Sequence, residues 1–148
     1  MINITKEFGI DMSHRLEGFE GKCNNVHGHR YRLLVTVSRN DDMLDNRKGH
    51  NNGMVVDFSL VKDIVEELIV DKMDHAFVYN SNDSDSKKIA KFLIKLIDQK
   101  CFALPFRTTA ENMSAWMYKE LNKRFNNLDI KCRKIVLFET PTSFAKYK

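Results

Sequence analysis

Two segments near the N-terminus alternate between apolar and polar residues, and both carry histidine on the apolar side of the pattern. They run from Ile2 to His14 and from His27 to Arg39. Residues two apart point to the same face of a β-strand, so the alternation predicts two strands that each bury one face. His14 ends the apolar face of the first strand, while His27 and His29 begin that of the second. The pattern therefore predicts three imidazoles on buried strand faces.

Three imidazoles with no fourth protein ligand in the pattern are typical of a catalytic zinc site, which keeps one coordination position open for water or substrate. A structural zinc site has four protein ligands instead. Cys23 stands four residues before His27, so it is the candidate fourth ligand in that second interpretation. Both interpretations are open at this point, and the number of protein ligands distinguishes them.

Composition narrows the class of protein. A chain of 148 residues and 17.3 kDa is long enough to bury a core without disulfides. Its cysteines, Cys23, Cys101 and Cys132, are scattered and form no C-x-x-C motif, which predicts reduced thiols. The net charge of +4 is mild and the lysines are spread over the predicted helices, so we expect no nucleic-acid partner. The same charge suits an anionic small substrate.

No apolar run approaches the roughly 18 residues that a membrane span needs. The N-terminal segment has the pattern of a strand rather than that of a signal sequence. We therefore expect a cytoplasmic protein with no membrane partner.

In the rest of the chain the spacing of apolar residues changes several times. Turn-forming polar residues from Asn40 to Gly53 predict a loop after the second strand. Beyond this loop the pattern predicts a short strand, three helices and two final strands. The short strand is expected at 54–57 and the two final strands at 133–138 and 144–147. The first helix is expected to begin at 59, the second to cover 86–100 and the third to begin at 108. Asp57 or Ser59 is the candidate cap of the first helix, and Thr108-Thr109-Ala110-Glu111 is a capping-box pattern.

The order of two strands, helices and two strands predicts an α+β domain. We expect one domain over residues 1–148, with a four-stranded antiparallel sheet and the helices on one of its faces, in the order β-β-α-α-β-β.

Six short motifs, each weak alone, occur in the order seen in one enzyme family. They are His14, Cys23-x3-His27-Gly28-His29, Val56-Asp57-Phe58, Met73-Asp74-His75, Thr109-Ala110-Glu111-Asn112 and Phe138-Glu139-Thr140. In this order they resemble the 6-pyruvoyltetrahydropterin synthase and 6-carboxytetrahydropterin synthase family, and the resemblance spans nearly the whole chain. It implies a tunnelling fold, in which the four-stranded sheets of neighbouring subunits form a barrel and two trimers stack into a homo-hexamer. Residues 86–100 are then an insertion or an extended second helix.

The resemblance also implies a role for particular side chains. It makes His14, His27 and His29 the zinc ligands, Cys23 the catalytic thiol with Asp74 and His75 as acid–base partners, and Glu139 the pterin anchor with help from Thr108 and Thr109. The chemistry of these residue types agrees. A nearby metal favours the thiolate form of a cysteine, and an adjacent carboxylate orients an imidazole. A carboxylate also accepts two parallel hydrogen bonds from the N–H and amino edge of a pterin.

Several of these residues also have structural interpretations. Asp74-His75 follows a helix and suits a polar C-terminal turn, and the Thr108 segment satisfies a helix N-terminus whatever the function. Cys23 could be an inert loop thiol, and Glu139 a solvated carboxylate at a strand end. Ile135 and Leu137 share the face of Glu139, however, which favours a semi-buried pocket.

The spacing between cysteine and histidine indicates which reaction to expect. The three residues between Cys23 and His27 resemble the 6-carboxytetrahydropterin synthases of the queuosine and 7-deazaguanine route. The resemblance thus implies zinc-dependent conversion of 7,8-dihydroneopterin triphosphate to 6-carboxytetrahydropterin, with release of acetaldehyde and triphosphate. The alternative is a 6-pyruvoyltetrahydropterin synthase, which stops at the diketone side chain. A third possibility is a zinc-binding module without catalysis.

Overall fold

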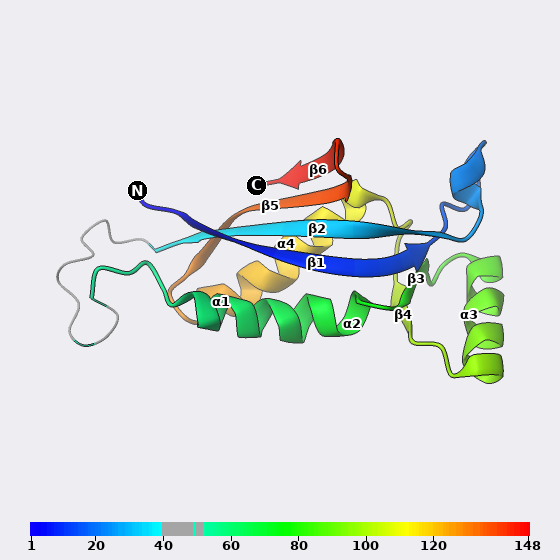
Figure 1. Ribbon diagram of the computed structural model, residues 1–148, viewed down its shortest axis with the longest axis horizontal. Coiled ribbons are helices and arrows are strands. Elements are labelled where there is room, and N and C mark those ends of the chain that lie inside the picture. The colour runs from blue at the N-terminus through cyan, green and yellow to red at the C-terminus, as the bar shows by residue number, and fades with distance from the viewer. Residues whose placement is uncertain (40–48, 50–51) are drawn as a thin grey trace.

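A six-stranded sheet with helices on one face forms the framework of the protein (Figure 1). The computed structural model describes residues 1–39, 49 and 52–148. The strand order is β4-β3-β1-β2-β5-β6. The strands are β1 (Ile4–His14), β2 (His27–Ser38), β3 (Phe77–Asn80), β4 (Cys101–Leu104), β5 (Lys131–Thr140) and β6 (Ser143–Tyr147). The helices are α1 (Phe58–Val65), α2 (Asp71–Met73), α3 (Ser84–Ile97) and α4 (Ala110–Asn126), with a 3-10 turn at Lys22–Asn24 and a π-helical segment at Glu66–Val70.

The β1–β2 pair is the longest ladder in the sheet. It is antiparallel and unbroken from Ile4 opposite Val37 to His14 opposite His27. Because side chains alternate along both strands, this register puts one residue in two on a common face. That face is the buried one, where Tyr31 is fully enclosed. Both strands predicted from the alternation are confirmed.

Two helical stretches cover this face. Residues 58–73 run continuously through α1, the π-helical segment and α2, and α4 lies beside them (Figure 1). Asp57 caps α1 by accepting a hydrogen bond from the Ser59 amide at 2.7 Å, and Thr109 caps α4 by accepting one from the Asn112 amide at 3.3 Å. On α4 the fully buried residues are Met113, Met117, Leu121 and Phe125. The Asp57 cap is confirmed, whereas the capping box expected at Thr108 and Glu111 is displaced by one residue, because Thr109 is the cap and bonds to Asn112.

The sheet corrects the expected architecture. The α+β class is confirmed, and β1, β2, β5 and β6 form the expected antiparallel block. Two further strands lie on the outer edge of β1, however, and both are parallel: β3 pairs with β1, and β4 pairs with β3. The sheet is therefore mixed and six-stranded instead of antiparallel and four-stranded. These added strands have four residues each, too few for an alternating pattern to identify them.

Two smaller expectations also differ. Residues 54–57 form no strand, because Val55 and Val56 pack into the core and Asp57 caps α1. The helix expected at 86–100 is α3, which ends earlier because Asp98 adopts a left-handed conformation, with φ at 53°. The loop expected at 40–53 falls mostly outside the described residues.

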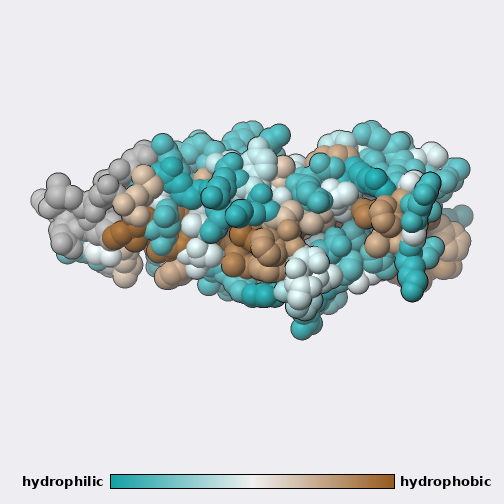
Figure 2. Space-filling view, turned by 90° about the horizontal axis from the view of Figure 1, so that it is seen from above, coloured by the Kyte–Doolittle hydropathy of each residue, from teal (hydrophilic) through white to brown (hydrophobic). Residues whose placement is uncertain are grey.

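Helix α3 lies at one end of the sheet and leaves its apolar stripe exposed (Figure 1). Only Ser86 and Ala90 of this helix are buried, whereas Phe92 and Leu96 are more than 60% exposed. Seen from above, the surface is largely hydrophilic with separate hydrophobic patches, one of them at the end formed by α3 and the β1–β2 connection (Figure 2). None of the helices in the described ranges is long and apolar enough to cross a membrane.

The covered face of the sheet should dominate stability. Leu121 of α4 is fully buried in the core, whereas Leu60 of α1 is 39% exposed. Leu121→Ala should lower the free energy of unfolding by about 2–5 kcal/mol, because it removes apolar contacts and leaves a cavity. Leu60→Ala makes the same chemical change and should lower the free energy of unfolding much less, because this side chain is partly exposed. Denaturant unfolding of both variants measures the difference, and equal losses would contradict this account of the core.

Candidate metal centre and adjoining pocket

Three histidines meet at the end of the β1–β2 ladder. Each of His14, His27 and His29 offers a ring nitrogen, and these nitrogens all lie within 4.8 Å of one another. The register explains the cluster, since His14 is paired with His27 and His29 follows two residues later on the same face. His14 is fully buried and the other two are half-buried. The convergence of the three imidazoles that the sequence predicts is therefore present.

Hydrogen bonds orient two of the rings. Nδ1 of His14 lies 2.9 Å from the Thr108 carbonyl oxygen, and Nδ1 of His27 lies 2.8 Å from the Asn25 carbonyl oxygen. A carbonyl only accepts, so Nδ1 donates in both rings and each Nε2 keeps a free lone pair. This is the arrangement by which outer partners fix the tautomer of a metal-binding histidine.

The free nitrogens fit a metal ion. Nε2 of His27 and Nε2 of His29 are buried and have no hydrogen-bond partner among the described residues. Buried polar atoms are normally satisfied, so two unsatisfied lone pairs at one point indicate a missing ligand. Burial also lowers the pKa of His14 and that of His29, which favours the neutral imidazole that metals bind. The three side chains could therefore hold a metal ion.

Tyr31 and Glu139 lie directly beside the cluster. The Tyr31 hydroxyl donates to Oε2 of Glu139 at 3.2 Å and lies 3.3 Å from Nε2 of His14. Oε1 of Glu139 is 3.8 Å from Nε2 of His29. Burial, together with the neighbouring Glu139 carboxylate, raises the pKa of Tyr31 far above its usual value, so the phenol stays a neutral donor. Glu139 is therefore a half-buried, oriented carboxylate and not a solvated one.

Sequence reasoning missed Tyr31 as a site residue. The signal was present, because Tyr31 is the next residue on the face that carries His27 and His29. A tyrosine on an apolar strand face is usually a core residue, and only the position of Glu139 gives its hydroxyl a role here.

Cys23 is near this site but outside the metal cluster. It lies on the 3-10 turn that precedes β2, and it is half-buried. The turn is fixed by Arg15, which donates to the Asn24 carbonyl at 3.1 Å and to the Asn24 side chain at 2.8 Å. In the described part of the chain, the group of side chains that could hold a metal consists of the three histidines without Cys23. This geometry favours an open metal site over a closed one.

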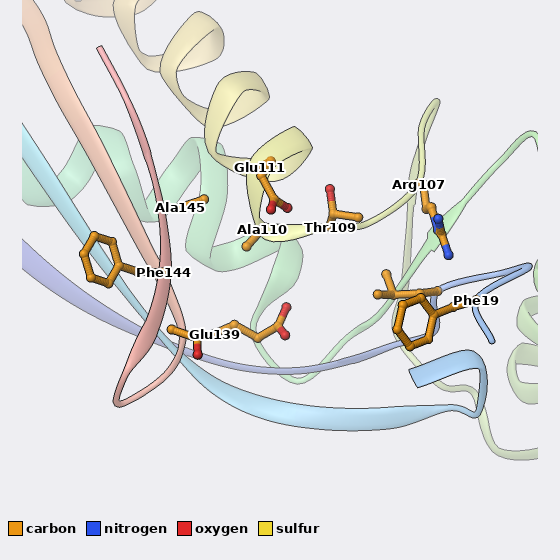
Figure 3. Close-up of a pocket in the computed structure, with 10 residues that line it drawn as sticks. Phe19, Arg107, Thr109, Ala110, Glu111, Glu139, Phe144 and Ala145 are labelled. Carbon is orange, nitrogen blue, oxygen red and sulfur yellow. The ribbon is translucent and has the colours of Figure 1, made fainter. Parts of the chain in front are cut away.

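A cavity of about 350 Å³ is linked to the cluster through Glu139, which lines the cavity and lies beside His29. Glu139 projects into it from the end of β5, the start of α4 provides Thr109, Ala110 and Glu111, and Phe19 and Arg107 lie at the far end (Figure 3). Thr109 therefore reaches the cavity, as expected of a substrate contact. Thr108 does not line it. Thr108 is fully buried, and its carbonyl holds His14 while its hydroxyl lies 3.3 Å from the Arg15 carbonyl.

Asp74 and His75 form the expected pair, but they are on the other side of the sheet. Nδ1 of His75 donates to Oδ2 of Asp74 at 2.7 Å, and Oδ1 of Asp74 accepts from the Asp11 amide at 2.8 Å. The His75 side chain is 78% exposed and borders a hollow lined by Gly28, His29 and Arg30 of β2 and by residues 11–13 of β1. The pair thus lies near the Asp11–Arg30 ion pair, whose positions alternate with those of Met12 and His29 along β1 and β2.

The fold and the site together define a class of α+β proteins. In this class two antiparallel strands carry a histidine cluster, and a glutamate held by a hydrogen bond lies between the cluster and a pocket. Residues 3–148 match the family model described as 6-pyruvoyl tetrahydropterin synthase. The chain belongs to this family.

Related proteins extend over the same length. The chain is 45% identical to a 6-carboxy-5,6,7,8-tetrahydropterin synthase of Haemophilus influenzae, with 100% of this chain and 99% of that protein covered. It is 34% identical to a protein of the same name from Rickettsia bellii, with 99% of each covered. An uncharacterized protein from Wolinella succinogenes has a similar fold, with a TM-score of 0.77 at 21% identity over 99% of this chain and 97% of that one.

The geometry predicts which histidines control metal content. Replacing His14, His27 or His29 with Ala should remove most bound metal, because each supplies one of the converging nitrogens. His75→Ala is the matched control and should retain the metal, since His75 lies on the opposite face of the sheet. Inductively coupled plasma mass spectrometry of the purified proteins measures this. Equal metal content in all four variants would refute the assigned centre.

Proposed function

We propose that this protein is a zinc-dependent 6-carboxytetrahydropterin synthase. It converts 7,8-dihydroneopterin triphosphate to 6-carboxy-5,6,7,8-tetrahydropterin, releases acetaldehyde and triphosphate, and serves queuosine and 7-deazaguanine biosynthesis. The observation that carries this proposal is the meeting of three histidine nitrogens beside a pocket whose wall holds an oriented glutamate. The names of the Haemophilus and Rickettsia relatives support the carboxylated product.

The cluster suits a catalytic zinc because it provides three imidazoles and leaves Cys23 out. Zinc held there supplies Lewis-acid chemistry, which favours proton loss from substrate hydroxyls next to it. The protein's own contribution is to present neutral imidazoles with fixed orientation. Thr108 and Asn25 do this for two of the rings through their carbonyl groups.

Glu139 suits the recognition of a pterin ring. Its carboxylate can accept two parallel hydrogen bonds from the N–H and amino edge of the ring. Tyr31 donates to one of the two carboxylate oxygens and so fixes the plane of the group without occupying all of its acceptor sites. Thr109 and the first turn of α4 form the neighbouring wall of the same cavity.

Proton transfer is assigned to Cys23 and to the Asp74–His75 pair. Cys23 lies on the turn leading into the metal-bearing strand, where a bound cation would favour its thiolate form. His75 donates from Nδ1 to Asp74, which leaves Nε2 as the group that exchanges a proton with substrate. Because this pair lies near Asp11 and Arg30, on the face of the sheet opposite the histidine cluster, the proposal requires His75 to act on a neighbouring subunit's site.

We propose a homo-hexamer built from two trimers, with active sites at subunit junctions. Strands β4 and β6 end the sheet on its two sides, and exposed edge strands are commonly paired or covered. Phe144 on β6 is 55% exposed and lines the substrate cavity, so a neighbour at this edge would also close the cavity. Localisation in the cytoplasm is part of the same proposal.

Product analysis tests the reaction. With 7,8-dihydroneopterin triphosphate, the protein should yield 6-carboxytetrahydropterin, acetaldehyde and triphosphate. Cys23→Ala should keep its metal and lose about 10²–10⁴-fold in turnover, as positioned acid–base groups contribute that much. Cys101→Ala, a matched change in β4, should stay active. Chromatography with mass spectrometry identifies the product. A pyruvoyl pterin without acetaldehyde would indicate the alternative synthase, and loss of metal from Cys23→Ala would indicate a structural zinc.

Mixed assemblies test the shared site. Cys23→Ala and His75→Ala should each be nearly inactive alone. The two variants are co-expressed with different affinity tags and purified through both tags. The mixed assemblies should regain about a quarter of wild-type activity, because random pairing of subunits brings an intact Cys23 and an intact His75 together at about a quarter of the junctions. The control is the double variant Cys23→Ala/His75→Ala mixed with either single variant, which can complete no junction. Mixed assemblies that stay inactive would mean that the two residues do not share a site across subunits.

A further inference from the structure

Arg107 carries a cationic side chain with an unusual environment. Its Nε and Nη2 atoms are buried and have no hydrogen-bond partner among the described residues. Four other arginines, Arg15, Arg30, Arg32 and Arg39, are paired with carboxylates. Leaving buried charged donors unsatisfied is costly, so this guanidinium points to an absent anionic acceptor.

The position of Arg107 relates it to the candidate site. It lies beside Phe19 at one end of the cavity, where its guanidinium carbon is 6.0 Å from the centre of the Phe19 ring. Phe144 is at the other end, and the Glu139 carboxylate lies between the two ends (Figure 3). Among the described residues that line the cavity, Arg107 is the one cation, whereas Glu111 and Glu139 are both acidic. An anionic group that enters the cavity is therefore repelled by the Glu111 and Glu139 carboxylates and attracted by the Arg107 guanidinium alone among these lining residues.

The backbone at Arg107 is held firmly. Its carbonyl oxygen accepts from the Thr109 amide at 2.9 Å and from the Asn112 side chain at 3.0 Å. The next residue, Thr108, accepts from His14. Two successive carbonyl groups thus fix this segment to the start of α4 and to the metal centre. Such support is what a preorganised binding residue requires.

We propose that Arg107 binds the triphosphate of the substrate while Glu139 holds the ring. This inference rests on the proposed function, because it assigns the anionic part of that substrate. A guanidinium presents a planar fork of donors that matches two phosphate oxygens at once. A cavity with the Glu139 carboxylate on its wall and a guanidinium at one end matches a molecule that carries both a donor edge and an anionic chain.

The first measurement uses inorganic tripolyphosphate as the probe. Isothermal titration calorimetry with the metal-loaded protein should show binding, and Arg107→Gln should weaken it about ten- to a hundredfold, the range for losing a hydrogen bond to a charged group. Arg107→Lys keeps the charge without the fork and should weaken it less. Arg124→Gln is the matched control and should bind as the wild type does, since Arg124 lies near the other end of α4, about 25 Å away.

The second measurement separates a phosphate contact from a structural role. Arg107→Gln should raise the apparent dissociation constant for 7,8-dihydroneopterin triphosphate by a similar factor, yet leave the binding of unphosphorylated 7,8-dihydroneopterin unchanged. Equal weakening of both ligands would overturn the proposal, since Arg107 would then shape the cavity or contact the ring. If Arg107→Gln does not fold, Arg107→Lys must still show weakening confined to the phosphorylated ligand.

The two proposals fail differently. Tripolyphosphate that binds wild type and Arg107→Gln equally would overturn the role of Arg107, whatever the turnover. Tripolyphosphate binding that depends on Arg107 in a protein unable to convert the pterin would support the anion site and refute the proposed reaction.

Discussion

The antiparallel ladder between β1 and β2 is the constraint on which the rest of the site depends. Its register places His14 directly opposite His27 and leaves His29 and Tyr31 on the same face. A slip of one residue would turn every side chain of one strand to the other face, so neither the core nor the histidine cluster would form. The same alternation that buries the apolar side chains therefore brings the ring nitrogens together.

The start of α4 connects this ladder to the pocket. The Thr108 carbonyl accepts from His14, and the next residue, Thr109, caps the helix. Arg107 immediately before them reaches the far end of the cavity. One short segment thus orients a candidate metal ligand, begins a core helix and places a cation. A rigid connection of this kind keeps the distances between the groups constant, which a site that positions an extended substrate requires.

The sheet also divides the chemistry of the proposed enzyme between its two faces. The histidine cluster and Glu139 belong to one face, while the Asp74–His75 pair lies near Asp11 and Arg30 of the other. His75 is held there by two contacts with Asp11 on β1, a backbone bond at 2.6 Å and the link through Asp74. The pair is therefore preorganised but exposed. In the proposed hexamer a neighbour's cavity would receive it, so assembly and catalysis would depend on the same contacts.

The sequence by itself determined the two long strands, their buried faces, the Asp57 cap and the histidines that share a face. These features follow from periodicity and from local hydrogen bonding, which involve residues a few positions apart. Only the tertiary structure decided which distant groups meet. Thr108 and His14 are 94 residues apart, and Tyr31 and Glu139 are 108 apart. The parallel strands β3 and β4, the position of His75 and the burial of the Arg107 guanidinium without a partner among the described residues depend on such long-range packing. Each is set by neighbours that no local pattern encodes.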